Sequence, residues 1–578
     1  MYDLSRSKIT PIFTSIISAI LFSSALIAAN PDAILYNGKI VTVDPRFSIV
    51  QAVAVSGEHV LAVGADEAIV TMRAANTKMI DLHGRTVLPG LIDSHVHALE
   101  AGLSEFRAPL LPLDSYAAVQ RFLREAAKTI PKGEWIVVPR TFPTRLQELR
   151  MPTKEMLDVI NDHPVVFDAS YVVILNSAAL QKCGIDRNTP NPPGGEIGKD
   201  ANGEPNGILK NGQALLKGVS LGGQFTDEEK LRALEDQLKR YVAAGLAGVG
   251  DRAVNQEQIK LYERLHDSGR LPLRVSMTWR PDASRPADEL IHAIETARYT
   301  QGSGDDWLRF STFKLTLDGG MTIGTAYQRQ PYGPFGKQLY AKTDPDDRGQ
   351  LFITPAKLLA VMRAARNRGW QLTTHDQGGG AIDAWLDTLE ALDREKPIKP
   401  TRSFVMHASF QSPEAIARMK RMGIAADTQS QWLYLDGAAL EQVFGNEGMR
   451  WFFPLRSYLD AGIKVAAGSD HMIGHDKNRA VNPYNPFVSM WTEVSRKMAD
   501  GRSLHSEQKI TREEALKTHT IWAAWLQFSE DKRGSIEPGK FADLVIIDRD
   551  YLSCTEDQIR RIEPDMVIID GKIAWERK

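Results

Sequence analysis

The run from Leu88 to His97, Leu-Pro-Gly-Leu-Ile-Asp-Ser-His-Val-His, constrains the fold of this chain more than any other stretch. An apolar strand pattern ends there in two histidines, His95 and His97, spaced i, i+2. Along a β-strand this spacing places both imidazoles on one face. Two neutral imidazoles converging from one strand end supply half of a transition-metal site. Two hydrogen-bonded structural histidines are the alternative, and the pair alone leaves both interpretations open.

Length and charge limit the classes of protein to consider. A chain of 578 residues is too long for one small core, so we expect two domains or one barrel with insertions. The net charge of −2 provides no basic field for nucleic acid and no acidic tail. Cys183 and Cys554 lie far apart in sequence and give neither a disulfide framework nor a thiolate zinc site. We expect a small-molecule substrate and no nucleic-acid partner, and a homo-oligomer stays open.

Residues 1–30 form a segment that we leave out of the fold. Arg6 and Lys8 precede an uncharged stretch from Ile9 to Asn30. That stretch ends in the small residues Ala25, Ala28 and Ala29. This order is typical of a secretory signal peptide, although the apolar run is also nearly long enough for an uncleaved membrane anchor. We expect an exported protein, periplasmic or secreted, that is held at a membrane only if the segment is retained.

Short β-like runs occur near both ends of the chain, between residues 33 and 80 and again between 542 and 575. Asn37-Gly38 predicts a hairpin turn in the first region, and Asp570-Gly571 predicts another tight turn in the second. Two terminal β segments around a long middle predict one small β-sandwich domain made from both termini. Its two parts are residues 31–87 and 526–578.

The middle of the chain alternates apolar strand-like runs with helical stretches, which favours parallel βα units. The strand candidates are Val87–Ser94, Val165–Ala169, Leu246–Gly250, Leu273–Thr278, Thr312–Leu317, Gln371–Thr374, Ser403–Met406, Ile424–Thr428 and Ile463–Ala467. These nine are one too many for an eight-stranded barrel. The run at Val165 lies in a segment rich in Pro and Gly, residues 104–224, which we assign to an insertion after the first barrel strand. We therefore predict an α/β fold, a distorted TIM (β/α)8 barrel over residues 88–525.

Polar residues of the kinds that bind metals follow several of these strands. They are Lys314, His375, His407 and Asp470, on the predicted barrel strands 4, 5, 6 and 8. The carboxyl ends of TIM-barrel strands face the active site, so these side chains can converge with the two histidines of strand 1. Each one alone has a structural alternative: a hydrogen-bonded histidine, a lysine paired with a carboxylate, or an aspartate that caps a helix. Their coincidence at one end of one barrel favours a common site.

At these residues the chain resembles the amidohydrolase superfamily, and within it the family 3 branch that includes N-substituted formamide deformylase. The matching pieces are Pro89–His97, Phe313–Gly319, His375, His407, Gly468–Asp470 and the C-terminal Gly534–Val545. Two further pieces, Pro152–Asp158 and Asn176–Leu180, fit the insertion of that branch. The resemblance implies a TIM barrel with a small β-sandwich.

The resemblance also implies a binuclear metal site. His95 and His97 would bind one ion and His375 and His407 the second, and Lys314, carbamylated by carbon dioxide, would bridge the two ions. Imidazole and oxygen ligands suit zinc, and manganese, iron or cobalt stay open. The implied reaction is metal-dependent hydrolysis of an amide or another non-peptide C–N bond by a metal-bound hydroxide. Asp470, also a metal ligand, would take the proton of the water and return it to the leaving nitrogen.

Three positions depart from the pattern of the branch. Tyr171 stands where the branch usually has a histidine, Gln377 falls where it reads Gly-Asp-Arg-Ala, and Trp432 replaces the histidine of Gln-Pro-x-His. The substrate is therefore left open. An esterase or lactonase with the same metal site is one alternative, and a weakly catalytic binding or regulatory protein on the same scaffold is another.

Overall fold

The computed structural model describes residues 30–578, so the predicted signal or anchor segment lies outside the described residues apart from Asn30. Eight parallel strands form one sheet in the order β20-β19-β18-β17-β16-β15-β14-β8. Their bounds are β8 (Leu91–Val96), β14 (Leu246–Val254), β15 (Arg274–Trp279), β16 (Leu308–Thr316), β17 (Gln371–Asp376), β18 (Phe404–His407), β19 (Ala425–Thr428) and β20 (Val465–Ala467). The two edge strands meet just beyond β20, where Val96 bridges His471 in parallel. The predicted distorted (β/α)8 barrel is confirmed.

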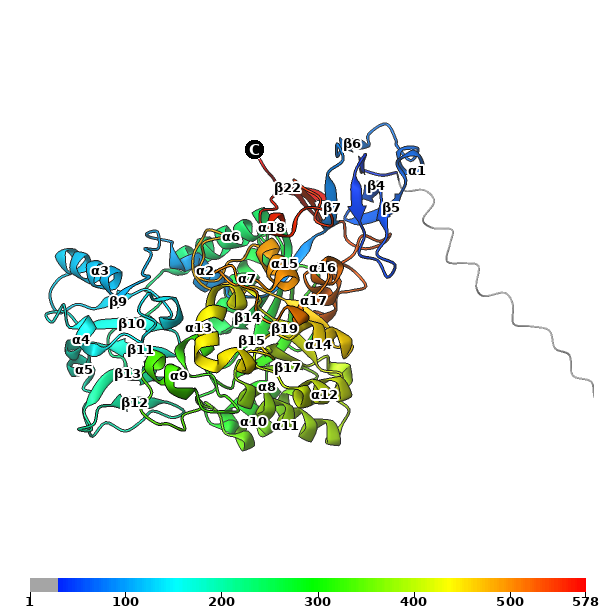
Figure 1. The fold of residues 1–578 in the computed structure, drawn as a ribbon. Helices are drawn as coiled ribbons and strands as arrows, with labels where there is room; N and C mark the ends of the chain where they lie inside the picture. Colours follow the sequence, from blue (N-terminus) through cyan, green and yellow to red (C-terminus); the bar gives the residue numbers. More distant parts are fainter. Residues whose placement is uncertain (1–29) are drawn as a thin grey trace, which may run out of the picture.

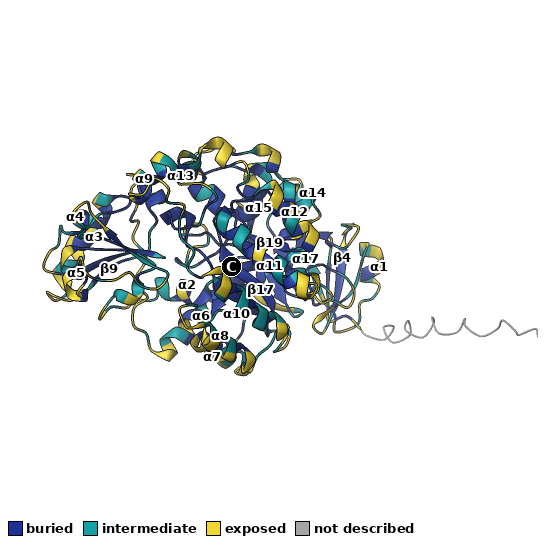
Figure 2. Cartoon of the chain, turned by 90° about the horizontal axis from the view of Figure 1, so that it is seen from below, coloured by how far each residue is buried: buried dark blue, intermediate teal, exposed yellow. Residues whose placement is uncertain are grey.

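Amphipathic helices cover the outside of the barrel, as α6 illustrates. A capping box of Thr226 and Glu229 starts this helix, and its buried face carries Leu231, Leu234 and Leu238 at helical spacing. The helices that follow the strands are α6 (Asp227–Ala243), α7 (Gln256–Asp267), α8 (Ala287–Glu295), α10 (Pro355–Asn367), α11 (Gly379–Glu395), α12 (Pro413–Met422), α14 (Leu455–Asp460), α16 (Arg512–Thr518) and α17 (Ile521–Leu526). Figure 2 shows their buried sides turned toward the strands. Among the described residues, no helix has the length and apolar character needed to cross a membrane.

Both ends of the described chain meet in a β-sandwich. One sheet has the order β5-β4-β1-β6, and the other has the order β23-β22-β21-β7-β2-β3. The strands are β1 (Ala33–Tyr36), β2 (Lys39–Val41), β3 (Ile49–Val50), β4 (Ala52–Ser56), β5 (His59–Gly64), β6 (Lys78–Asp81), β7 (Thr86–Pro89), β21 (Leu544–Ile547), β22 (Pro564–Ile569) and β23 (Lys572–Glu576). The C-terminal β21 pairs directly with the N-terminal β7, and Leu35, Val53 and Leu544 share one buried cluster. The predicted sandwich made from both termini is confirmed.

Two local predictions need correction. Asn37-Gly38 does form a tight turn, with Asn37 at φ 55°, but its flanking strands β1 and β2 belong to different sheets, so it is not a hairpin. The predicted strand at residues 87–94 is in fact two strands, β7 in the sandwich and β8 in the barrel. Gly90 stands between them because a Cβ there would lie 2.5 Å from the Cβ of Ala247. Asp570-Gly571, in contrast, does join the antiparallel hairpin of β22 and β23.

The predicted insertion forms a sheet of its own, in the order β12-β13-β11-β10-β9. Its elements are α3 (Tyr116–Thr129), β9 (Ile136–Val138), α4 (Lys154–Leu157), β10 (Val165–Ala169), β11 (Val172–Leu175), α5 (Ser177–Cys183), β12 (Glu196–Lys199) and β13 (Pro205–Lys210). Val119 and Phe167 of the insertion share a buried cluster with Tyr332 and Trp432 of the barrel. In Figures 1 and 2 the insertion and the sandwich lie at opposite ends of the barrel.

A buried ion-pair cluster joins the barrel to the sandwich and provides a test of their coupling. Arg274 of β15 lies 2.9 Å from Asp543 and 3.0 Å from Asp570, and its side chain is almost fully buried. Arg274→Ala leaves both carboxylates without this partner, so we expect a loss of about 3–5 kcal/mol in the free energy of unfolding. Arg363→Ala removes an exposed pair with Glu395 and should cost less than about 1 kcal/mol. Equal effects of the two variants on chemical denaturation would contradict this assignment.

Candidate active site

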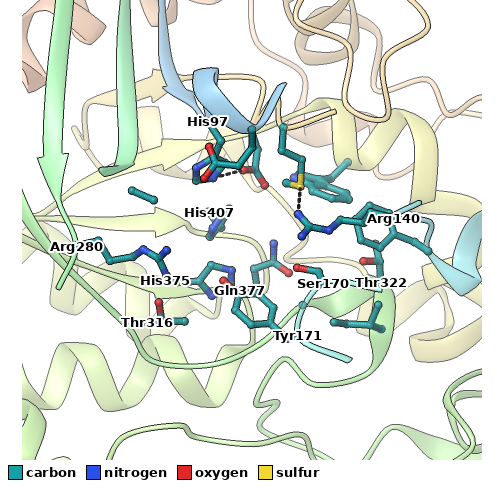
Figure 3. Close-up of a pocket in the computed structure, with 18 of the residues that line it drawn as sticks. His97, Arg140, Ser170, Tyr171, Arg280, Thr316, Thr322, His375, Gln377 and His407 are labelled. Atoms are coloured by element: carbon teal, nitrogen blue, oxygen red, sulfur yellow. Dashed lines mark hydrogen bonds and ion pairs between the residues drawn. The ribbon is translucent and has the colours of Figure 1, made fainter. Parts of the chain in front are cut away.

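The predicted site residues converge at the carboxyl end of the barrel. Five of the six line one cavity of about 280 Å³, namely His97, Lys314, His375, His407 and Asp470. The sixth, His95, is fully buried beside the cavity, and its ring centroid lies 5.0 Å from that of His407 and 5.3 Å from that of His97. The ring centroids of His375 and His407 are 4.4 Å apart. Four imidazoles, from β8 and the residue just after it, β17 and β18, are thus packed together (Figure 3).

The donor atoms on β8 and after β20 fit a metal ion. Oδ1 of Asp470 lies 3.1 Å from Nε2 of His97 and 3.4 Å from Nε2 of His95. One ligand atom from each of these three residues lies within 4.8 Å of the other two. Within residues 30–578, Nε2 of His95 and Nε2 of His407 are buried and have no hydrogen-bond partner. Buried nitrogens without partners are costly unless a ligand satisfies them, so this donor set fits a divalent metal.

The surroundings of the histidines keep them neutral and fix the nitrogen that faces the cavity. Burial lowers the pKa of His375 to about 3 and the pKa of His407 well below its usual value. Nδ1 of His375 lies 3.0 Å from a carboxylate oxygen of Asp318, and Nδ1 of His407 lies 2.8 Å from the side-chain oxygen of Gln429. When Nδ1–H donates to these oxygens, Nε2 keeps its lone pair for a metal.

Lys314 of β16 lies beside a second positively charged side chain, Arg280. Trp279, the last residue of β15, is in register with Phe313 of β16, so the next residues, Arg280 and Lys314, are neighbours. Burial, and then the nearby Arg280 guanidinium, lower the pKa of Lys314 to about 7. The ammonium form of lysine has no acceptor for a metal, and the lowered pKa favours the neutral amine, which has a lone pair.

Two of the site residues have strained backbones. His407 has a φ of 63° and Asp470 a φ of 55°, in the left-handed region that residues with a side chain seldom adopt. Such positions cost on the order of 1–3 kcal/mol each and cluster at functional sites. Asp470 is held there because its N–H donates to the carbonyl of His95 over 2.8 Å and its carbonyl accepts from Asn482. In this conformation the carboxylate of Asp470 lies beside His95 and His97.

The walls of the cavity come largely from other segments. The insertion contributes Arg140, Phe142, Ser170, Tyr171 and Gln213, and later barrel loops contribute Gln377 and Trp432. The rings of Tyr171 and His375 meet edge to face with their centroids 5.3 Å apart, and the ring centroids of Phe142 and Trp432 are 5.6 Å apart. The three positions that depart from the branch pattern, Tyr171, Gln377 and Trp432, therefore all face this one cavity.

Comparisons with known proteins agree with the fold and show the family. A sequence model of the Amidohydrolase family matches residues 78–574. The chain belongs to the amidohydrolase family. It is 30% identical over 557 residues to N-substituted formamide deformylase of Arthrobacter pascens, an alignment that covers 94% of this chain and 98% of the relative. Members of this family are metal-dependent hydrolases that act on C–N bonds, and this chain is an enzyme of that kind.

Solved structures show the same fold. An uncharacterized metal-dependent hydrolase of Pyrococcus horikoshii OT3 superposes with a TM-score of 0.67 at 21% identity, over 91% of this chain and 99% of that one. Atrazine chlorohydrolase TrzN of Arthrobacter aurescens TC1, complexed with zinc, superposes with a TM-score of 0.51 at 16% identity, over 94% of each chain. At these sequence identities the similarity shows a shared fold, and it does not identify a substrate.

Several residues of this site have no role in the site predicted from the sequence. Asp318 and Arg280 each follow the carboxyl end of a barrel strand, which is the same signal that identified His375 and Asp470. Gln429 also follows a strand, but a side-chain amide carries no specific signal for histidine positioning. Arg140 lies in the insertion, and nothing in the sequence indicates that it reaches the cavity.

Gly468 tests how tightly the site depends on strand packing. A Cβ at this position would lie 2.4 Å from the backbone nitrogen of His95 and 2.7 Å from its Cβ. Gly468→Ala should push the histidine strand away from Asp470, lower the free energy of unfolding by about 1–3 kcal/mol and reduce the bound metal. Gly222→Ala is the control because a Cβ there meets nothing within 4 Å. Elemental analysis and thermal unfolding measure both effects, and wild-type metal content in Gly468→Ala would refute the expectation.

Proposed function

We propose that this enzyme hydrolyses an amide or another non-peptide C–N bond of a small molecule, using two divalent metal ions that we take to be zinc. The strongest support is the set of neutral imidazoles grouped with Lys314 and Asp470 around one small cavity. His95 and His97 would hold one ion, and His375 and His407 would hold the other. Imidazole and carboxylate donors suit zinc.

Lys314 would complete the set as its carbamate. The neutral amine attacks the carbon of carbon dioxide, an N–C bond forms, and one proton leaves to solvent. The product is an anion whose two oxygens can each accept a metal, which the ammonium form cannot do. The position of Lys314 on β16, between the histidines of β8 and those of β17 and β18, suits a bridge between two ions.

Asp470 would carry the proton transfers. When bound, the metal ions supply an activated water and polarise the scissile carbonyl. Asp470 takes the proton of the attacking water on its carboxylate and gives it to the leaving nitrogen as the C–N bond breaks. His97 and His95 lie within 3.4 Å of Oδ1 of Asp470 and keep this carboxylate beside the reacting groups.

Substitutions of Asp470 and His95 separate catalysis from metal assembly. Asp470→Asn keeps the shape and a weak oxygen ligand but removes the base, so turnover should fall by at least about 10²–10⁴-fold while much of the metal stays bound. His95→Ala should lose metal and activity together. Metal content and turnover are measured on the same preparations, with matched amide and ester substrates. Near-normal turnover in Asp470→Asn would overturn the mechanism, and cleavage of the ester alone would overturn the C–N assignment.

We also propose that the protein is exported, to the periplasm or beyond. The support is the charged, apolar and small-residue order of residues 1–30. Expression of the full chain should yield a mature protein that has lost about thirty residues, found outside the cytoplasm by fractionation and N-terminal sequencing. Recovery of the intact N-terminus in the membrane fraction would instead identify an anchor, and recovery in the cytoplasm would refute export.

A further inference from the structure

Arg280 lines the active-site cavity and carries a positive charge that forms no ion pair within the described residues. It follows the last residue of β15, and its backbone N–H donates to the carbonyl of Val254 over 3.0 Å, which fixes the start of its side chain. Figure 3 shows its side chain extending toward His375 and Thr316, inside the group of residues that line the cavity. The Arg280 side chain therefore reaches the place that a substrate would occupy.

In the part of the chain that the structure describes, no carboxylate pairs with this charge. Across residues 30–578, Arg280 forms no ion pair within 4.0 Å, and its buried Nε has no hydrogen-bond partner. The charge of the buried Arg252, in contrast, is paired: Nε lies 3.4 Å from a carboxylate oxygen of Asp427 and donates to the carbonyl of Ser94, although Nη2 has no hydrogen-bond partner. Arg140 on the insertion is also paired, through Nε, with Asp168 at 3.1 Å. A buried guanidinium nitrogen without a partner is costly unless a ligand supplies the acceptor.

The acidic side chains that line the cavity are already engaged. Among the described residues, these are Asp470 and Glu100. Asp470 lies against His95 and His97, and Glu100 accepts a hydrogen bond from the side chain of Gln258 over 3.1 Å. Apart from the proposed carbamate on Lys314, whose oxygens would be taken up by the two ions, the anion that pairs with Arg280 must therefore come from outside the chain.

We propose that Arg280 binds a carboxylate on the part of the substrate that does not react, so that the enzyme acts on carboxylate-bearing amides. This inference rests on the proposed function and names its substrate class. The planar guanidinium matches a carboxylate with two parallel hydrogen bonds, which is the strongest and most directional form of this pairing. Phe142 and Trp432 supply an apolar wall of the same cavity for the remainder of the molecule.

The test compares two amides that differ only in the charged group. The probes are N-formylphenylalanine and N-formylphenethylamine, assayed with the metal-containing enzyme. We expect the wild type to favour the carboxylate by about 10–100-fold in kcat/KM, the range of a hydrogen bond to a charged group. Arg280→Gln should lower the ratio of the two kcat/KM values by at least about tenfold. Arg124→Gln, on the exposed side of α3, is the matched control and should keep the wild-type ratio.

Two results of this assay would overturn the proposal. One is a wild-type enzyme that favours the neutral amide. The other is an equal loss on both probes in Arg280→Gln, because Arg280 would then act through Lys314 or the metal ligands and not through the substrate carboxylate.

Calorimetric titration with 3-phenylpropionate, which has no amide to cleave, separates this proposal from the proposed function. Binding that weakens at least about tenfold in Arg280→Gln but not in Arg124→Gln supports the carboxylate site even if neither amide is hydrolysed. In that case the proposal of C–N hydrolysis would be refuted, and the proposal of a carboxylate site at Arg280 would be supported. Equal binding by the wild type and Arg280→Gln would show that the carboxylate binds elsewhere, for example at the metal ions, and would refute the role of Arg280.

Discussion

The seam between the first and last barrel strands is the constraint on which the rest of the site depends. Asp93 of β8 reaches across it, and its Oδ1 accepts from the backbone N–H of Ser469 over 2.9 Å and from that of His95 over 3.0 Å. The N–H of Asp470 in turn donates to the carbonyl of His95. One carboxylate thus ties together two segments separated by 376 positions in the chain. Because Gly468 leaves no space for a side chain, the seam sets the approach of Asp470 to His95 and His97.

The barrel interior near the site is polar, which requires a supporting network. Arg252 of β14 and Asp427 of β19 form an ion pair across the interior at 3.4 Å, and Asp427 also accepts from the hydroxyl of Ser94 at 2.6 Å. Gln429 donates to Asp427 and accepts from Nδ1 of His407, so the network ends at a proposed metal ligand. A buried pair of charges contributes little net stability, but removing one member is costly. The network therefore restricts the orientation of the histidine more than it stabilises the fold.

Much of this architecture follows from the sequence. The hydrophobic pattern identifies each barrel strand, and the end of that strand gives the location of the side chains that follow it. Each predicted barrel strand occurs, and polar residues at or after the carboxyl ends of several of them line the common cavity, as His375 and Asp470 do. The pattern fails where one apolar run serves two sheets, as at residues 87–94, because periodicity cannot reveal a change of sheet at Gly90. The turn at Asn37-Gly38 fails for the same reason.

The contacts of the insertion lie beyond what the sequence can predict, since they depend on how a separate sheet docks on the barrel. The tip between β10 and β11 illustrates this. Ser170 has a φ of 71°, which turns the chain sharply and places Tyr171 in the cavity against His375. The local sequence does not indicate whether this hairpin tip contacts His375 or lies on the surface. Likewise, the unpaired state of Arg280 follows only from knowing every neighbour in three dimensions.

Tyr171 and Arg280 also define the chemistry of the cavity wall. Burial raises the pKa of Tyr171 to about 12, so its phenol stays protonated and serves as a hydrogen-bond donor in place of the imidazole common in the branch. Arg280 can only donate. Gln377 accepts from the N–H of Met321 through its side-chain oxygen, which leaves its amide N–H groups to face the cavity. Because these three side chains all present donors, the wall complements a ligand rich in acceptor oxygens, and the positive guanidinium favours those oxygens when they carry negative charge.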